Sequence, residues 1–192
     1  MTPMKILAIF LKLLHRDCKM RTIRNSVFET NSSSMHSISF ASDAPIVTVK
    51  ELYINASGEY GWEITDYSDP NSKLDYATVA FLHIARNAVK SELEEDMKDY
   101  IEEKLHGVKD CFASHGVTVN FADDMYNVEV KRYDLRMYVS VNMLGYIDHQ
   151  SAPYKDGDSD SDVLADWFAN NPEELFKFVF NNSSIHTDND NH

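Results

Sequence analysis

Cysteine and glycine are both scarce in this sequence. Its 192 residues include two cysteines, Cys18 and Cys111, and six glycines. Two cysteines are too few for the disulfide framework of a small secreted domain, so we expect reduced thiols in a cytoplasmic protein. The sequence also lacks a C-x-x-C pair, an H-E-x-x-H motif, a Walker loop and a dinucleotide fingerprint. We therefore predict no cofactor and no metal site of a known pattern.

Long apolar runs are absent as well. The most apolar stretch, residues 4–14, is interrupted by Lys12 and is too short to span a bilayer as a helix. No small-residue cleavage site follows it, so a signal peptide is not predicted. Met20 opens a segment that resembles a natural protein start. We expect residues 1–19 to be an appended helix or an upstream-start extension, with a weak membrane anchor as the alternative, and residues 20–192 to form one domain.

Lys and Arg are also few compared with Asp and Glu. Lys and Arg number 18 against 31 Asp and Glu, which gives a net charge of −13. A chain this acidic repels phosphate backbones, so direct nucleic-acid binding is not expected except through the basic N-terminal segment. Residues 151–192 are the most acidic part, with nine Asp and Glu against two Lys. This asymmetry suits a partner with a basic groove, and it equally suits ordinary solubility.

Hydrophobic periodicity predicts the α+β class. Apolar residues recur every three or four positions from about residue 72 to 116, where Ser91 and Glu94 form a candidate capping box, and again at 162–170 and 172–180. Strand-like segments are expected at 22–28, 36–41, 46–54, 60–67, 117–121, 128–133, 135–141 and 145–150. The first two are expected to pair as a hairpin. The result would be an antiparallel or mixed sheet with a helical layer packed on one face.

Two polar segments carry candidate site chemistry. Asn31, Ser32, Ser33 and Ser34 form a turn whose hydroxyl and N–H groups can bind an anion, and His36 follows as an acid or base. A polar hairpin turn is the ordinary interpretation of that segment. The second segment comprises four consecutive polar residues: Asp148, His149, Gln150 and Ser151. They carry a carboxylate, an imidazole, an amide and a hydroxyl in that order. In a strand these four would alternate between two faces, which makes a catalytic triad of neighbours geometrically poor.

A resemblance covers about a sixth of the chain. The block RTIRNSVFETNSSSMHS, residues 21–37, resembles the opening of a family of small proteins found in bacteriophages and prophages, mostly of Gram-positive bacteria. Fainter similarity lies at residues 146–151 and at residues 185–191, which include Asn189 and Asn191. The resemblance implies a mobile-element origin and supports Met20 as the start of the core. It implies no catalytic role for any residue.

Two further patterns are incomplete. Residues 156–162 look like the start of a calcium loop, but neither possible register places Gly and Glu where an EF-hand needs them. Cys111 and His115 lie four residues apart on one face of a predicted helix. Two ligands do not make a zinc site, so a buried thiol beside a helix-ending histidine is the favoured interpretation.

The leading hypothesis is an acidic accessory protein, encoded by a mobile element, that binds and inhibits a host protein with a basic nucleic-acid-binding cleft. An inhibitor of a CRISPR effector would be one instance. The predicted contact surface lies on the long helix and comprises Glu92, Glu94, Glu95, Asp99, Glu102 and Glu103. A solvated helix face is the ordinary interpretation of these residues.

The alternative hypothesis is a small enzyme or a nucleotide- or phosphate-binding protein. It predicts that residues 31–36, 148–151 and 189–191 converge on one pocket. The acid–base groups would be His36, His149 and Asp148, and the ligand-binding groups would be Asn31, Ser32, Ser33, Ser34, Gln150, Ser151, Asn189 and Asn191. A structural or virion component is the third hypothesis, disfavoured because the sequence has no repeats or heptads.

Overall fold

A computed structural model of the chain describes residues 34–61, 63–88, 93–133, 136–148 and 160–189. Its helices are α2 (Pro70–Ala88), α3 (Glu94–Ser114), α4 (Asp160–Asn170) and α5 (Pro172–Phe180). Its strands are β1 (Ser34–Ser39), β2 (Glu51–Ile54), β3 (Glu59–Tyr60), β4 (Thr65–Tyr67), β5 (Thr118–Phe121), β6 (Tyr126–Tyr133), β7 (Arg136–Met143), β8 (Tyr146–Ile147) and β9 (Ser184–Asn189). The α+β prediction is confirmed. None of the described helices is long and apolar enough to cross a membrane.

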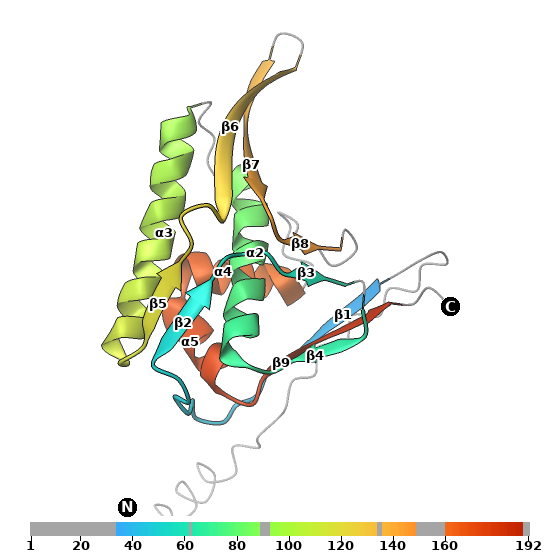
Figure 1. The fold of residues 1–192 in the computed structure, drawn as a ribbon, viewed down its shortest axis with the longest axis vertical. Coiled ribbons are helices and arrows are strands. Elements are labelled where there is room, and N and C mark those ends of the chain that lie inside the picture. Colours follow the sequence, from blue (N-terminus) through green and yellow to red (C-terminus); the bar gives the residue numbers. More distant parts are fainter. Residues whose placement is uncertain (1–33, 62, 89–92, 134–135, 149–159, 190–192) are drawn as a thin grey trace, which may run out of the picture.

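The strands form several small sheets of both types. β1, β9 and β4 make an antiparallel sheet in that order, and β6 pairs with β7 as an antiparallel hairpin that projects from one end of the molecule (Figure 1). β2 pairs with β5, and β3 with β8, in parallel. Because parallel pairing needs a crossover connection, the helices between these strands are part of the same packing unit.

Helix α2 is the centre of the core (Figure 1). Asp69 accepts a hydrogen bond from the backbone N–H of Ser72 at 2.9 Å, and Pro70 occupies the first helical position, so the predicted helix start at 69–72 is confirmed. The predicted apolar stripe is buried at Leu74 and at Phe81, whose ring stacks on Phe168 of α4 with centroids 4.6 Å apart. This stacking joins α2 to α4, the pair of helices that closes the core on one side.

Lys73, also on α2, is fully buried. Its Nζ donates hydrogen bonds to the carbonyl oxygens of Phe178, Asn181 and Ser183 at 2.9, 2.9 and 3.1 Å. These carbonyls lie at the end of α5 and just beyond it, where a helix has unsatisfied acceptors. Burial lowers the pKa of Lys73 to about 8. The charged side chain therefore acts as a C-terminal cap supplied by another helix.

Three sequence predictions need correction. The expected strand at 46–54 is confined to β2, and the expected strand at 60–67 is divided into β3 and β4 by a turn at Gly61, whose φ is +116°. A strand extends only as far as its partner, and β5 offers β2 only four residues.

The N-cap of α3 is Leu93 and it makes no side-chain cap hydrogen bond, so the predicted capping box at Ser91 is wrong.

Strand β9 was not predicted. Its sequence, SIHTDN, is mostly polar and has only Ile185 and Thr187 of the residue types that favour strands. It is extended because it lies between β1 and β4 and pairs with both. The predicted partner of residues 36–41, residues 22–28, lies outside the described part of the chain, as do residues 1–19.

Candidate functional site

The side chain of His36 lies at a junction of β1, α2 and α4. Its Nδ1 is 3.2 Å from the hydroxyl of Tyr76, and that hydroxyl is 2.7 Å from Oγ of Ser161. Tyr76 and Ser161 are buried. Next to Ser161, the carboxylate of Asp160 accepts a hydrogen bond from the backbone N–H of Ile38 at 3.3 Å. A continuous chain of polar contacts therefore links the β1 sheet to two helices.

Gly61 brings a second predicted residue to His36. A Cβ at this glycine would lie 2.6 Å from His36 Nε2 and 2.7 Å from the Cβ of Asp148. Asp148 follows β8, and its backbone N–H donates to the carbonyl of Tyr60 at 3.0 Å. The parallel pairing of β3 and β8 thus delivers Asp148 to the imidazole, with room between them only because residue 61 has no side chain.

Besides His36, three residues of the predicted common pocket lie in the described part of the chain: Ser34, Asp148 and Asn189. β1 and β9 pair with Ser34 opposite Asn189 and His36 opposite Thr187. Together with the approach of Asp148, this places described parts of all three predicted segments in one region. The other predicted members of this site lie outside the described residues: Asn31, Ser32, Ser33, His149, Gln150, Ser151 and Asn191. The calcium-like segment 156–162 was expected to be a solvated acidic loop. Its residues 156–159 are also outside the described part, whereas residues 160–162 begin α4, where Ser161 and Asp162 are buried, so the expected loop is wrong for these residues.

The electrostatics of this region favour a neutral imidazole. Burial lowers the pKa of His36 to about 4, against an opposing effect of Asp148 and with a smaller lowering by His186. At pH 7 the ring carries no charge. The carboxylic residue that acts on it, Asp148, is itself buried, at 8% exposed. The imidazole of His36 therefore offers a phosphate no positive charge, and its contacts make a better structural network than an anion site.

A small cavity lies elsewhere. It has a volume of about 220 Å³ and is bordered by the aromatic side chains of Phe40, which follows β1, Trp167 of α4 and Phe178 of α5, and by Lys177. None of the residues predicted to bind a ligand lines it. A cavity of this volume is below the range usual for cofactor sites.

The predicted contact surface lies on α3. The helix buries Met97, Ile101, Leu105, Val108 and Phe112. On the other side, Glu95, Asp99, Glu102 and Glu103 are exposed. Lys98 pairs with Glu94 and Lys104 with Glu103, whereas Glu95, Asp99 and Glu102 form no ion pair with any residue that the structure describes. Glu92 lies outside the described residues.

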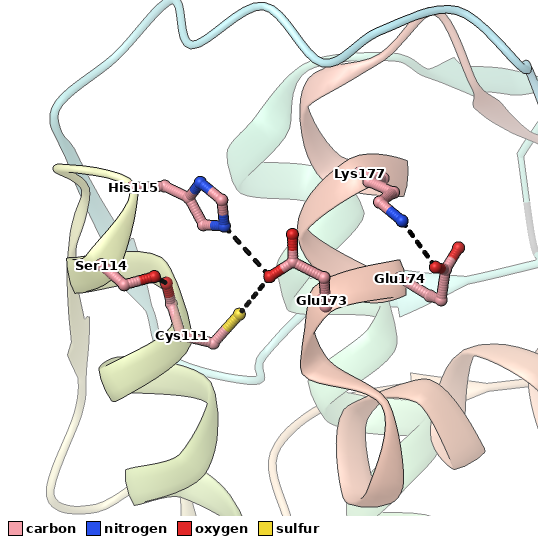
Figure 2. A network of polar contacts seen from close by, with 6 residues as sticks. All are labelled: Cys111, Ser114, His115, Glu173, Glu174 and Lys177. Atoms are coloured by element: carbon pink, nitrogen blue, oxygen red, sulfur yellow. Dashed lines mark hydrogen bonds and ion pairs between the residues drawn. The ribbon is translucent and has the colours of Figure 1, made fainter.

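A third cluster lies between the end of α3 and the start of α5 (Figure 2). His115 is the C-cap of α3, as predicted, but Cys111 is partly exposed and not a buried core thiol. Both side chains lie within hydrogen-bond distance of the same oxygen of Glu173. Cys111 Sγ is 3.5 Å and His115 Nε2 is 3.0 Å from Oε2. Sequence reasoning missed Glu173, because it is 58 residues beyond His115 and no spacing rule connects them.

The fold and these contacts define a mixed α+β protein with a partly buried histidine network and an acidic outer helix. Comparisons with models of protein families, with curated proteins and with solved structures find no match. The resemblance of residues 21–37 to phage-encoded proteins therefore stays a prediction.

Proposed function

We propose that the protein binds a partner protein with a basic, nucleic-acid-binding cleft, using the exposed acidic face of α3. The resemblance to phage proteins makes a host protein the expected partner and inhibition the expected effect. The observation that carries the proposal is the uncompensated row of Glu95, Asp99 and Glu102 on the solvent side of a helix whose opposite side is in the core.

The geometry of this row suits recognition of a cationic surface. Consecutive members are four and three residues apart, so their backbone positions advance by about 6 and 4.5 Å along the axis. α3 lies at one edge of the molecule (Figure 1), where a cleft can approach it. Because the helix is anchored by five buried side chains, the backbone that carries these charges is held in place before binding. Fixed charges of one sign steer a partner of opposite sign and raise the association rate.

The test compares two triple variants that remove the same charge. E95Q/D99N/E102Q neutralises the row, and E59Q/E63Q/E129Q neutralises three exposed carboxylates outside α3. Immobilised protein captures partners from nuclease-treated bacterial lysate, and each captured protein is then purified for titration at several salt concentrations. The α3 variant should lose about 0.6–3 kcal/mol of affinity at low salt, since three exposed ion pairs contribute about 0.2–1 kcal/mol each.

Competition identifies the surface of the partner. A captured protein that uses its nucleic-acid cleft should be released by added duplex DNA, and its affinity should fall as salt rises. Equal binding by the two variants, or capture that neither salt nor duplex DNA reduces, would contradict the proposal.

The second candidate function is the small enzyme or phosphate binder. The approach of His36 to Asp148 and the register of Ser34 with Asn189 favour it, because these residues are far apart in sequence. The neutral imidazole and the neighbouring carboxylate of Asp148 weigh against an anionic ligand. Calorimetric titration with inorganic phosphate and with ATP tests it. Binding that is lost in Ser33→Ala, at unchanged thermal stability, would establish this function in place of a purely structural role.

A further inference from the structure

Three side chains with metal-binding chemistry meet where α3 ends and α5 begins. Cys111 and His115 lie on the last turn and cap of α3, and Glu173 lies in the first turn of α5. Their donor atoms Sγ, Nε2 and one carboxylate oxygen all lie within 4.8 Å of one another. Figure 2 shows the three side chains directed toward one point between the two helices.

The packing of the two helices holds these donors in position. The ring of His115 stacks on Phe176 with centroids 4.0 Å apart and planes 14° apart. Phe176 is buried and meets the edge of Phe112 at 5.2 Å. Gly116, with φ of +77°, ends α3 directly after His115. The position of the imidazole is therefore set by the core and by the helix end, and not only by its contact with Glu173.

The distances fit tetrahedral coordination after a small side-chain rotation. Zn²⁺ binds thiolate sulfur, imidazole nitrogen and carboxylate oxygen at about 2.0–2.3 Å, which places neighbouring donors of a tetrahedron about 3.3–3.7 Å apart. The separations from Glu173 Oε2 are 3.5 Å to Cys111 Sγ and 3.0 Å to His115 Nε2. Because Glu173 is exposed, its carboxylate can rotate to open the space for an ion.

The donor set selects the class of ion. A thiolate and a carboxylate carry two negative charges and balance a divalent cation, while the imidazole stays neutral. Mg²⁺ and Ca²⁺ prefer oxygen donors only, whereas a sulfur–nitrogen–oxygen set suits Zn²⁺. Lys177, whose charge also acts on Glu173, forms its ion pair with Glu174 at 2.7 Å. Three protein ligands leave the fourth position of a tetrahedron to water.

We propose that Cys111, His115 and Glu173 bind Zn²⁺ and so join α3 to α5. On binding, the thiol proton of Cys111 leaves to solvent and the sulfur–zinc bond takes its place. The site is independent of the function proposed above, although it anchors the same helix that bears the acidic row.

Cobalt(II) is the probe, because a tetrahedral Co²⁺–thiolate site absorbs in the visible and near-ultraviolet regions. The untagged full chain carries Cys18→Ser in every sample, so that any thiolate band reports Cys111. Titration should reach one Co²⁺ per chain, and one equivalent of Zn²⁺ should remove the bands. Separate Cys111→Ser, His115→Gln and Glu173→Gln substitutions should each abolish or strongly weaken them.

Two controls are matched to the site by residue type. Glu174→Gln removes the adjacent carboxylate, and His106→Gln removes an exposed histidine of the same helix; both should keep the bands. Circular dichroism verifies that each variant is folded. Absence of a thiolate band in the folded parent protein, or bands that persist in Cys111→Ser, would overturn the proposal.

Stability provides a second readout that does not depend on colour. Zn²⁺ at 100 times its dissociation constant should shift the folding equilibrium of the parent protein about 100-fold toward the native state. The shift should be lost in Glu173→Gln and kept in Glu174→Gln. Equal shifts in these two variants would mean that the ion binds elsewhere.

Discussion

Burial of a neutral His36 makes the stability of the protein depend on pH in a defined window. Its pKa is about 4 in the folded protein, against an ordinary value of 6.5. Between these values the unfolded chain binds a proton that the native state does not, so stability rises with pH. It is complete above about pH 6.5 and declines as the pH falls toward 4.

The size of the effect follows from the two pKa values. Acidification from pH 7 to pH 5 should remove about 2 kcal/mol of folding free energy through this one residue, and about 3 kcal/mol is removed by pH 4. Burial is the largest cause of the lowered pKa; of the titratable groups that act on the ring, Asp148 opposes it and His186 adds to it.

Urea unfolding at a series of pH values measures this dependence. Carboxylates also titrate in this range, so the informative quantity is the difference between wild type and His36→Gln at each pH. That difference should shrink by about 2 kcal/mol between pH 7 and pH 5, since only the wild type then loses the contribution of His36. His106→Gln, at an exposed histidine, serves as the control and should retain the wild-type slope. Parallel curves for wild type and His36→Gln would refute the argument that a neutral imidazole is buried there.

Three substitutions test the packing around Gly61, Gly107 and Lys73. Gly61→Ala should destabilise the protein by about 2 kcal/mol or more, because the new methyl group would lie 2.6 Å from His36 Nε2 and the backbone φ is positive. Gly107→Ala, in an open position on α3, is the control and should stabilise the protein by up to about 1 kcal/mol. Equal effects of the two substitutions in thermal denaturation would contradict the packing around Gly61. Lys73→Met should cost about 3 kcal/mol in urea unfolding, because three carbonyl oxygens lose a charged donor, and a loss below about 1 kcal/mol would show that this cap is dispensable.

The helices were largely predictable because local periodicity encodes them. The apolar stripe that includes Leu74 and Phe81 needs only its own sequence spacing to be recognised. The short strands were harder. β9 has little intrinsic strand preference and is extended because β1 and β4 hydrogen-bond to it on both sides, which is a long-range effect.

Some features of the candidate sites were also predictable from the sequence, and others depend on the tertiary structure. The spacing of Cys111 and His115 places them on one helical face, and this can be deduced from sequence alone. The sequence alone also determines the acid excess and the row of carboxylates on α3. Only the tertiary structure decides that Glu173 completes a cluster with Cys111, and that Asp148 approaches His36 past Gly61. These contacts join residues tens of positions apart, and they form because the buried faces of separate elements pack together, which no local pattern specifies.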